Sequence, residues 1–344
     1  MAEPSGRDRG LAAVVLAAGE GTRMRSRLVK VLHPLAGRPM IHHVLSSVRA
    51  LEAEPIVCVI GFQEERVREA LASVSGIRFA VQEDQRGTGH ALRCAAPRLD
   101  GFEGDVFVCC GDTPLLSADT LEELVALHRE EDAPATLLAA RLEDPSGYGR
   151  VIVDDGRILR IVEEADADAE VREIRLVNAG VYCFDWPVVE PLLAELEPEN
   201  VQGEEYLTDV VGLLAERGRH ARVSELEDPR EMTGVNDRAQ LAEVEGVIRR
   251  RIRRRLMARG VTFLAPETTL VDADVDIGPD TVVYPDVLIE GASTVGREAV
   301  IGPFSRIVDS HVGRGAELRG WNHLVRTTIP NGAIVKAFVR RGAD

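Results

Sequence analysis

The last quarter of the chain repeats every six residues. Aliphatic residues recur at this spacing from Val271 to Ile307 without exception. Side chains alternate with a period of two along a β-strand and of about 3.6 along an α-helix, so neither element explains the pattern. A period of six is typical of a hexapeptide β-helix, in which each aliphatic side chain points into a prism-shaped core. The seven positions are Val271, Ile277, Val283, Ile289, Val295, Ile301 and Ile307.

The predicted β-helix is short. After Ile307 the spacing slips to Val312 and then runs through Leu318 to Leu324, which indicates a turn that is one residue shorter. At about 18 residues per coil, the segment 271–324 holds about three coils. We expect this segment to be scaffold that carries no chemistry. The residues expected to cap its open end are Trp321, Ile329, Val335 and Phe338.

The first ~230 residues alternate short β-rich runs with helical patterns, which predicts an α/β fold around a mostly parallel sheet. An Asp154-Asp155-Gly156 turn between two β-rich runs predicts an antiparallel hairpin at 150–162, so the sheet should be mixed. The strands are predicted at 12–16, 56–60, 77–81, 106–110 and 136–140. The helices are predicted at 39–51, 64–73, 89–96, 118–129 and 205–217.

We predict three segments: an α/β domain at 10–236, a connecting helix at 237–261 and the β-helix with its cap at 262–344. The connecting helix is rich in arginine, and a basic run of this kind can bind nucleic acid. It has no interleaved aromatic residues and lies in an acidic chain, so a solvated helix is the favoured interpretation. Its arginines are Arg249, Arg250, Arg251, Arg253, Arg254 and Arg255.

The overall charge limits the partners. The 344 residues include 57 acidic and 41 Lys or Arg residues, for a net charge of −16. Such a surface repels phosphate backbones and anionic lipid, so we expect neither nucleic acid nor membrane as a partner. The apolar run 11–18 is too short to span a bilayer. The five cysteines have no C-x-x-C spacing and mostly lie in apolar runs, which predicts reduced thiols in a cytoplasmic protein.

The strongest chemical signal is the run LAAGEGTRM at 16–24, followed by Lys30. A strand leads into Ala18, Gly19 and Gly21, whose backbone N–H groups can face an anion. Arg23 adds a forked donor for phosphate oxygens, and Lys30 adds a compact charge. The run is neither a P-loop nor a dinucleotide-binding motif, because it lacks the Gly-Lys-Ser/Thr and the third glycine that these require.

Two further strand ends carry polar groups. Gln82 precedes Gly87-Thr88-Gly89, and its amide could pair with the edge of a pyrimidine base while the glycines let the backbone approach a flat ring. Asp112 follows the strand at 106–110, where open α/β sheets bind ligands, and a carboxylate there suits Mg²⁺. Asn236 could supply a second magnesium oxygen or cap the following helix.

Candidates for a hydroxyl-rich ligand come from the middle of the chain, and each is weak alone. They offer carboxylate and amide acceptors, hydroxyl groups and open backbone. They are Gly149, Glu163, Asn178, Tyr206 and Thr208. The histidines have no zinc-binding spacing, and the sequence has no G-x-S-x-G nucleophile motif.

Together, these motifs resemble the N-acetylglucosamine-1-phosphate uridylyltransferase family, bifunctional bacterial enzymes of cell-wall (peptidoglycan) precursor synthesis. The match covers roughly residues 11–244. It rests on LAAGEGTRM, KVLHPLAGRPM, QEDQRGTGHA, GDTPLL, GYGRV, VNAGVY, NVQGEEYLTD and GVNDRAQL, in this order. The resemblance implies a Rossmann-like nucleotidyltransferase fold followed by a short left-handed parallel β-helix. The implied reaction joins UTP and N-acetylglucosamine-1-phosphate, with Mg²⁺, into UDP-N-acetylglucosamine and pyrophosphate.

The resemblance also implies roles for single residues. Arg23 and Lys30 would neutralise phosphates, and Asp112 and Asn236 would hold Mg²⁺. The implied nucleotide contacts are Ala18, Gly19, Gly21, Gln82, Gly87 and Thr88. The implied sugar contacts are Gly149, Glu163, Asn178, Tyr206 and Thr208.

The β-helix departs from the family. It is shorter than usual, and we find no match to the family's acetyltransferase site of Arg, Lys, Tyr and Asn residues. We therefore expect that activity to be absent and the β-helix to serve as a possible homotrimer contact. Two alternatives stay open: a nucleotidyltransferase for another sugar-1-phosphate or another nucleotide, and a non-catalytic scaffold that binds sugar nucleotides.

Overall fold

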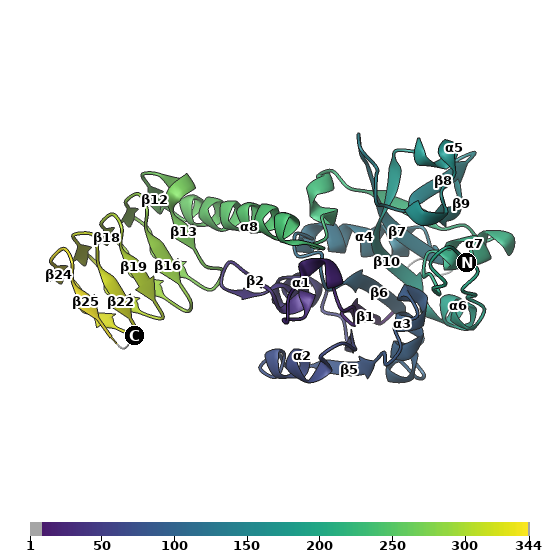
Figure 1. The fold of residues 1–344 in the computed structure, drawn as a ribbon, viewed down its shortest axis with the longest axis horizontal. Coiled ribbons are helices and arrows are strands. Elements are labelled where there is room, and N and C mark those ends of the chain that lie inside the picture. Colours follow the sequence, from purple (N-terminus) through teal and green to yellow (C-terminus); the bar gives the residue numbers. More distant parts are fainter. Residues whose placement is uncertain (1–8, 343–344) are drawn as a thin grey trace, which may run out of the picture. The chain divides into compact units, whose positions relative to one another are not determined.

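The computed structural model describes residues 9–342, which form two compact units (Figure 1). Of these residues, the first unit holds 9–33 and 39–238, and the second holds 34–38 and 239–342. The last two residues of the predicted segment 262–344 lie outside the described residues. The three predicted segments stay a prediction of domain organisation. None of the helices within residues 9–342 combines the length and the hydropathy of a membrane-spanning segment.

The first unit is built on one mixed sheet. Its strands are β1 (Leu11–Leu16), β4 (Ile56–Ile60), β5 (Ile77–Val81), β6 (Asp105–Cys110), β7 (Ala135–Arg141), β8 (Arg150–Asp154), β9 (Arg157–Val162), β10 (Leu176–Asp185) and β11 (Arg222–Glu225). Their order is β11-β7-β10-β6-β1-β4-β5, and the hairpin β8–β9 pairs with β10. Strands β6, β1, β4 and β5 are parallel, whereas β10 is antiparallel to both β6 and β7. The predicted α/β fold with a mixed, mostly parallel sheet is confirmed.

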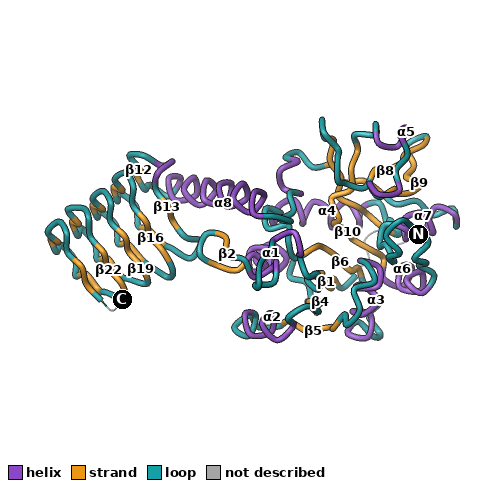
Figure 2. Tube along the Cα trace, in the orientation of Figure 1, coloured by secondary structure: helices purple, strands orange, loops and turns teal. Residues whose placement is uncertain are grey.

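Helices cover both faces of this sheet (Figure 2). Alternate residues of β1 enter different cores: Ala12 and Val14 belong to one, and Ala13 and Val15 to the other. Both faces are therefore buried, which explains why the central strands are continuous apolar runs. The helices are α1 (Met40–Ala50), α2 (Glu64–Ala70), α3 (Thr88–Ala95), α4 (Ala118–Glu130), α5 (Ala169–Arg172), α6 (Trp186–Val189) and α7 (Asp209–Glu216).

One of the predicted helices begins later than expected. We predicted a helix at 205–217, but α7 begins at Asp209. The backbone of Glu205 bonds with Arg86 and Gly89 instead of joining a helix. A tertiary contact therefore overrides the local helical pattern at residues 205–208.

The second unit contains the predicted β-helix. Its short strands are β12 (Thr262–Phe263), β13 (Leu270–Val271), β14 (Asp276–Ile277), β15 (Val282–Val283), β16 (Leu288–Glu290), β17 (Thr294–Val295), β18 (Val300–Ile301), β19 (Arg306–Val308), β20 (His311–Val312), β21 (Glu317–Leu318), β22 (His323–Val325), β23 (Thr328–Ile329), β24 (Ile334–Val335) and β25 (Arg340–Arg341). They form three parallel sheets of five, five and four strands. All seven hexapeptide positions are buried.

The slip after Ile307 is also confirmed. Val282 pairs with Val300, 18 residues later, whereas Thr294 pairs with His311, only 17 residues later. The following coils keep the shorter length, since His311 pairs with Thr328.

The cap prediction was wrong for all four residues. Ile329 and Val335 are core residues of β23 and β24, at 0% and 3% exposure, so the coils continue beyond Leu324. The spacing slips by one residue again between Leu324 and Ile329, which hides the repeat from a strict six-residue search. Trp321 and Phe338 are not buried as a cap. Trp321 stacks between Phe304 and Phe338 in an exposed row, with ring centroids 5.1 Å from Phe304 and 5.3 Å from Phe338.

The basic helix is less solvated than predicted. Helix α8 (Arg238–Ala258) lies against the first coils of the β-helix. Arg249 bonds with Glu245 and Asp272, and Arg253 is buried and donates to the carbonyl of Thr269. The description as a solvated helix was therefore wrong for these two arginines, whose guanidinium groups hold the helix to the coils. Strands β2 (Pro34–Leu35) and β3 (Arg38–Pro39) form a separate two-stranded sheet.

Candidate active site

The loop after β1 turns sharply at Gly21 and comes back to Lys30. Gly21 has a φ of 69°, and a Cβ placed on it would lie 2.6 Å from the Cβ of Lys30. Both facts require glycine, because this conformation strains other residues and carbon atoms in contact lie about 3.5 Å apart. A short 3₁₀ turn at Thr22–Met24 follows and carries Arg23. The glycine therefore fixes how closely the loop approaches Lys30.

Four side chains from separate motifs meet beyond the carboxyl ends of β1 and β6. Lys30 forms an ion pair with Asp112 through Nζ and Oδ2, and Nζ lies 3.2 Å from Oδ1 of Asn236. Arg23 donates to the same Asn236 oxygen at 3.0 Å. The backbone N–H of Val235 donates to the carbonyl of Asp112 at 2.9 Å, which brings Asn236 to this strand end.

The oxygens of Asp112 and Asn236 fit a magnesium ion. Both lie against one cationic atom, Nζ of Lys30, so they converge on one point. Mg²⁺ is commonly held by one or two protein oxygens together with substrate phosphates. Among residues 9–342, no cluster of three or more His, Cys, Asp or Glu residues is arranged to hold a metal. A metal here would therefore depend on oxygens from the substrates.

Gln82 and Thr88, two of the predicted nucleotide contacts, hold the loop at residues 82–90 in place. The side-chain amide nitrogen of Gln82 lies 3.0 Å from the carbonyl oxygen of Gly87 and 3.0 Å from Nδ1 of His90. The hydroxyl oxygen of Thr88 accepts from the backbone N–H of Leu207 at 3.0 Å. These contacts use the amide nitrogen of Gln82 as a donor and the hydroxyl oxygen of Thr88 as an acceptor.

This loop is also tied to the glycine-rich loop. The side-chain amide of Gln85 donates to the carbonyl of Ala18 at 2.9 Å. Gly19 is exposed, and no atom lies within 4 Å of a Cβ placed on it. The backbone at Ala18 and Gly19 is therefore held in position while one side of it stays open to a ligand.

Four of the five predicted sugar residues contact one another. The backbone N–H of Asn178 donates to the carbonyl of Gly149 at 2.8 Å, and a Cβ on Gly149 would lie 3.2 Å from a carboxylate oxygen of Glu163. Thr208 donates to Glu163 at 3.1 Å. Asn178 in turn donates to the hydroxyl of Tyr182 at 2.6 Å.

Burial changes the acidity of this region. Burial raises the pKa of the Glu163 carboxyl, and the nearby carboxylates of Asp209 and Asp166 raise it further, against the hydrogen bond from Thr208. Burial also raises the pKa of the Cys110 thiol to about 12. Asp112, Lys30 and Glu163 all influence this thiol electrostatically, so Cys110 lies near all three.

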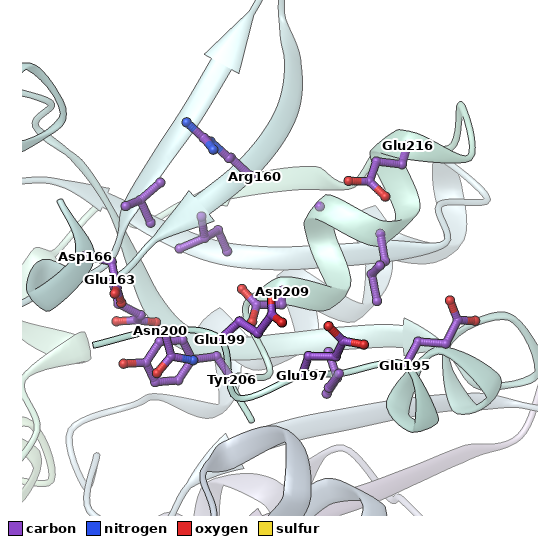
Figure 3. A pocket seen from close by; sticks show the side chains of 15 residues that line it. Arg160, Glu163, Asp166, Glu195, Glu197, Glu199, Asn200, Tyr206, Asp209 and Glu216 are labelled. Atoms are coloured by element: carbon purple, nitrogen blue, oxygen red, sulfur yellow. The ribbon is translucent and has the colours of Figure 1, made fainter. Parts of the chain in front are cut away.

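A cavity of about 590 Å³ opens beside Glu163 and Tyr206 (Figure 3). Seven of its lining residues are carboxylates, and Arg160 is the basic one among them. This charge disfavours phosphate groups in the cavity and favours them at Arg23 and Lys30. The seven carboxylates belong to Glu163, Asp166, Glu195, Glu197, Glu199, Asp209 and Glu216.

Comparison with known proteins decides the family. Residues 13–181 match the MobA-like NTP transferase domain. The chain is 43% identical over 335 residues to the bifunctional protein GlmU of Brevibacillus brevis, a match that covers 96% of this chain and 72% of that protein. The chain belongs to the GlmU family. Its first unit is accordingly a sugar-1-phosphate nucleotidyltransferase domain, as the motifs predicted.

Other GlmU proteins are similarly close. The protein of Pelobacter propionicus is 49% identical over 287 residues, which cover 83% of this chain and 62% of that protein. The protein of Geobacillus thermodenitrificans is 44% identical, with 89% and 67% covered. The chain therefore covers less than two thirds of the length of the Pelobacter propionicus protein.

A solved structure shares the fold of this GlmU family member. It is described as a glucose-1-phosphate thymidylyltransferase from Bacillus anthracis, and it superimposes with a TM-score of 0.56 at 20% identity. The match covers 69% of this chain and 95% of that chain. At this identity the likeness supports the fold alone.

The motifs predicted most of the residues that the structure brings together, but not Glu205, Arg86 and Arg93. Glu205 is buried between the two arginines, which contact its two carboxylate oxygens at 2.5 and 2.6 Å. The motif NVQGEEYLTD contains Glu205, but adjacent acidic residues commonly face solvent, so the sequence alone gave no sign of its burial.

Proposed function

We propose that the chain transfers a uridylyl group from UTP to N-acetylglucosamine-1-phosphate and releases pyrophosphate. The observation that carries the proposal is the convergence of Arg23 and Lys30 on the oxygens of Asp112 and Asn236. In a chain with a net charge of −16, this site gathers two cations where two phosphorylated reactants can meet. Family membership supplies the reaction class, and the specific substrates are part of the proposal.

The reaction is an in-line displacement. A phosphate oxygen of the sugar-1-phosphate attacks the α-phosphorus of UTP, a new P–O bond forms, and the bond to the bridging oxygen of pyrophosphate breaks. The nucleophile is already anionic, so the residues need to position reactants and offset charge rather than remove a proton. Arg23 and Lys30 would stabilise the negative charge on the departing pyrophosphate.

Asp112 and Asn236 would hold Mg²⁺. The ion, when bound, supplies Lewis-acid polarisation of phosphate oxygens and a template for the two reactants.

We assign the sugar to the group formed by Gly149, Asn178, Glu163 and Thr208, with Tyr206 beside it. The carboxylate of Glu163 can accept hydrogen bonds from ring hydroxyls, and Asn178 can pair with an acetamide. The acidic cavity next to them would admit a neutral ring more readily than a second phosphate. The nucleotide would lie along Ala18, Gly19, Gly21, Gln82, Gly87 and Thr88.

The test is a matrix of initial rates. Pyrophosphate release is measured with Mg²⁺, with UTP, CTP and dTTP each against N-acetylglucosamine-1-phosphate, glucosamine-1-phosphate and glucose-1-phosphate. The proposal predicts the highest kcat/KM for UTP with N-acetylglucosamine-1-phosphate. Another preferred pair would replace the substrates, and no pyrophosphate release with any pair would favour a non-catalytic scaffold.

We further propose that the chain lacks acetyltransferase activity. Its residues from 262 onward contain one lysine, Lys336, and one tyrosine, Tyr284, and no set that matches the acetyltransferase site of the family. Incubation with acetyl-CoA and glucosamine-1-phosphate should therefore release no free coenzyme A thiol. Release of the thiol at a rate comparable to uridylyl transfer would overturn this part.

The β-helix is proposed to form a homotrimer. The exposed row of Phe304, Trp321 and Phe338 is an apolar surface of the kind that a second copy would cover. Light scattering after size exclusion would give three times the 37.5 kDa chain mass if the trimer forms. A cytoplasmic location stays a prediction.

A further inference from the structure

Glu205 joins the two loops that carry the predicted substrate contacts. We call residues 86–89 the nucleotide loop and residues 200–208 the sugar loop. The backbone N–H of Glu205 donates to the carbonyl of Arg86 at 2.7 Å, and its own carbonyl accepts from Gly89 at 2.8 Å. A Cβ placed on Gly87 would lie 2.5 Å from the Glu205 carbonyl oxygen, so the loops approach as closely as glycine permits.

The Glu205 side chain adds a buried ionic contact to these backbone bonds. The residue is 1% exposed. Nη2 of Arg86 lies 2.5 Å from Oε1, and Nη2 of Arg93 lies 2.6 Å from Oε2, the latter as an ion pair without hydrogen-bond alignment. Arg93 also donates to the carbonyl of Leu193 at 3.1 Å, which fixes this guanidinium. A buried charge that loses its partners is strongly unfavourable, so the contact holds the two loops in one arrangement relative to each other.

Each of the two loops carries a residue that we propose contacts a substrate. The nucleotide loop carries Thr88, whose hydroxyl oxygen accepts from the Leu207 backbone in the sugar loop at 3.0 Å. The sugar loop carries Thr208, which donates to Glu163. A chain of contacts thus runs from the base side through Glu205 to the sugar side within the first unit.

We propose that Glu205 is a positioning residue that couples binding of the sugar phosphate to binding of the nucleotide. An acceptor held by Glu163 and Thr208 fixes the sugar loop, and the Glu205 contacts then fix the nucleotide loop with it. The nucleotide meets a loop that is already ordered and binds more tightly, and by linkage the nucleotide strengthens acceptor binding by the same factor. This inference rests on the proposed function and concerns how its two sites communicate.

The experiment is calorimetry with a UTP analogue that carries a methylene group between the α- and β-phosphorus and so cannot be transferred. Its Kd is measured with Mg²⁺, without and with saturating N-acetylglucosamine-1-phosphate. In the wild-type protein the acceptor should tighten analogue binding about 10-fold, which corresponds to about 1.4 kcal/mol. Glu205→Gln should bring this ratio close to one. Glu204→Gln makes the same charge change at the next residue and should keep the wild-type ratio.

The outcomes separate this inference from the proposed function. A wild-type ratio of one, or a Glu205→Gln ratio equal to that of the wild type, overturns the coupling even when pyrophosphate release is normal. A purely structural role would lower the melting temperature and leave the ratio unchanged. If Glu205→Gln does not fold, Arg86→Gln takes its place, because that side chain is 54% exposed; a lowered ratio supports the coupling and an unchanged ratio overturns it. If the wild-type protein does not bind the analogue, both proposals are wrong.

Discussion

Replacing Gly21 with alanine tests how closely the loop geometry controls the active site. The added Cβ would lie 2.6 Å from the Cβ of Lys30, whereas carbon atoms in contact lie about 3.5 Å apart. Relief of this overlap requires Lys30 and the loop to separate by roughly 1 Å, the difference between the two distances. A displacement of that size in a positioning group can lower turnover by about 100-fold. We therefore expect Gly21→Ala to lower kcat by about this factor.

The same substitution affects stability only modestly. Gly21 has a φ of 69°, and an alanine in the left-handed region is less favourable by about 1–2 kcal/mol. For a domain of the size of the first unit, the melting temperature should fall by about 2–8 °C. The protein therefore stays folded at assay temperature, and the loss of activity reports on Lys30 rather than on unfolding.

Gly76→Ala is the matched control. Gly76 has a φ of 79°, and no atom lies within 4 Å of a Cβ placed there, so the backbone strain is similar and Lys30 is not affected. Turnover is measured as pyrophosphate release at saturating UTP and sugar phosphate, and stability by thermal unfolding. The reasoning fails if Gly21→Ala keeps kcat within about threefold of the wild type, or if Gly76→Ala loses as much activity.

Three further predictions use the charged groups. Burial alone would raise the pKa of Asp105, but the charges of His128 and Arg129 and the hydrogen bond from Arg129 hold it below its ordinary value, so its stabilising effect is present above about pH 4 and lost below. Asp105→Asn should therefore lower the free energy of unfolding at neutral pH by about 3–5 kcal/mol in urea titrations, and a loss under about 1 kcal/mol would contradict the account. Because the pKa of Glu163 is raised, more of it is protonated in mild acid than of an ordinary Glu, so KM for the sugar phosphate should rise between about pH 7 and about pH 5. Glu163→Gln should remove this dependence, and an unchanged profile would refute the sugar assignment. EDTA should abolish pyrophosphate release and excess Mg²⁺ should restore it, whereas full activity in EDTA would exclude the proposed metal site.

Much of the fold could be predicted because it depends on local patterns. The central strands are β-branched, apolar runs, and a sheet buried on both faces requires such runs. The meeting of Lys30 and Asp112 could be anticipated as well, since both follow parallel strands whose carboxyl ends share one edge of the sheet. The six-residue period predicted the core of the β-helix until the second slip of one residue, after Leu324, hid Ile329 and Val335.

Other features depend on contacts that no local pattern records. Glu205 is buried because Arg86 and Arg93, about 110–120 residues earlier in the chain, surround its carboxylate. The backbone hydrogen bonds of Glu205 with Arg86 and Gly89 also explain why α7 begins only at Asp209. The arginines of α8 look like a solvent face in sequence, yet Arg253 is buried against a backbone carbonyl of the β-helix. Each of these features required the tertiary pairing to be known first.

The central claim is that Arg23 belongs to a site that offsets charge on two phosphorylated reactants. Its most direct test compares kcat for Arg23→Ala with kcat for Arg27→Ala, which removes the same charge from an exposed position of the same loop. Loss of one preorganised charge-stabilising donor should lower kcat about 100-fold or more for Arg23→Ala, while Arg27→Ala stays near the wild type. If Arg23→Ala stays within a few-fold of the wild type, or if both variants fall equally, the claim is wrong.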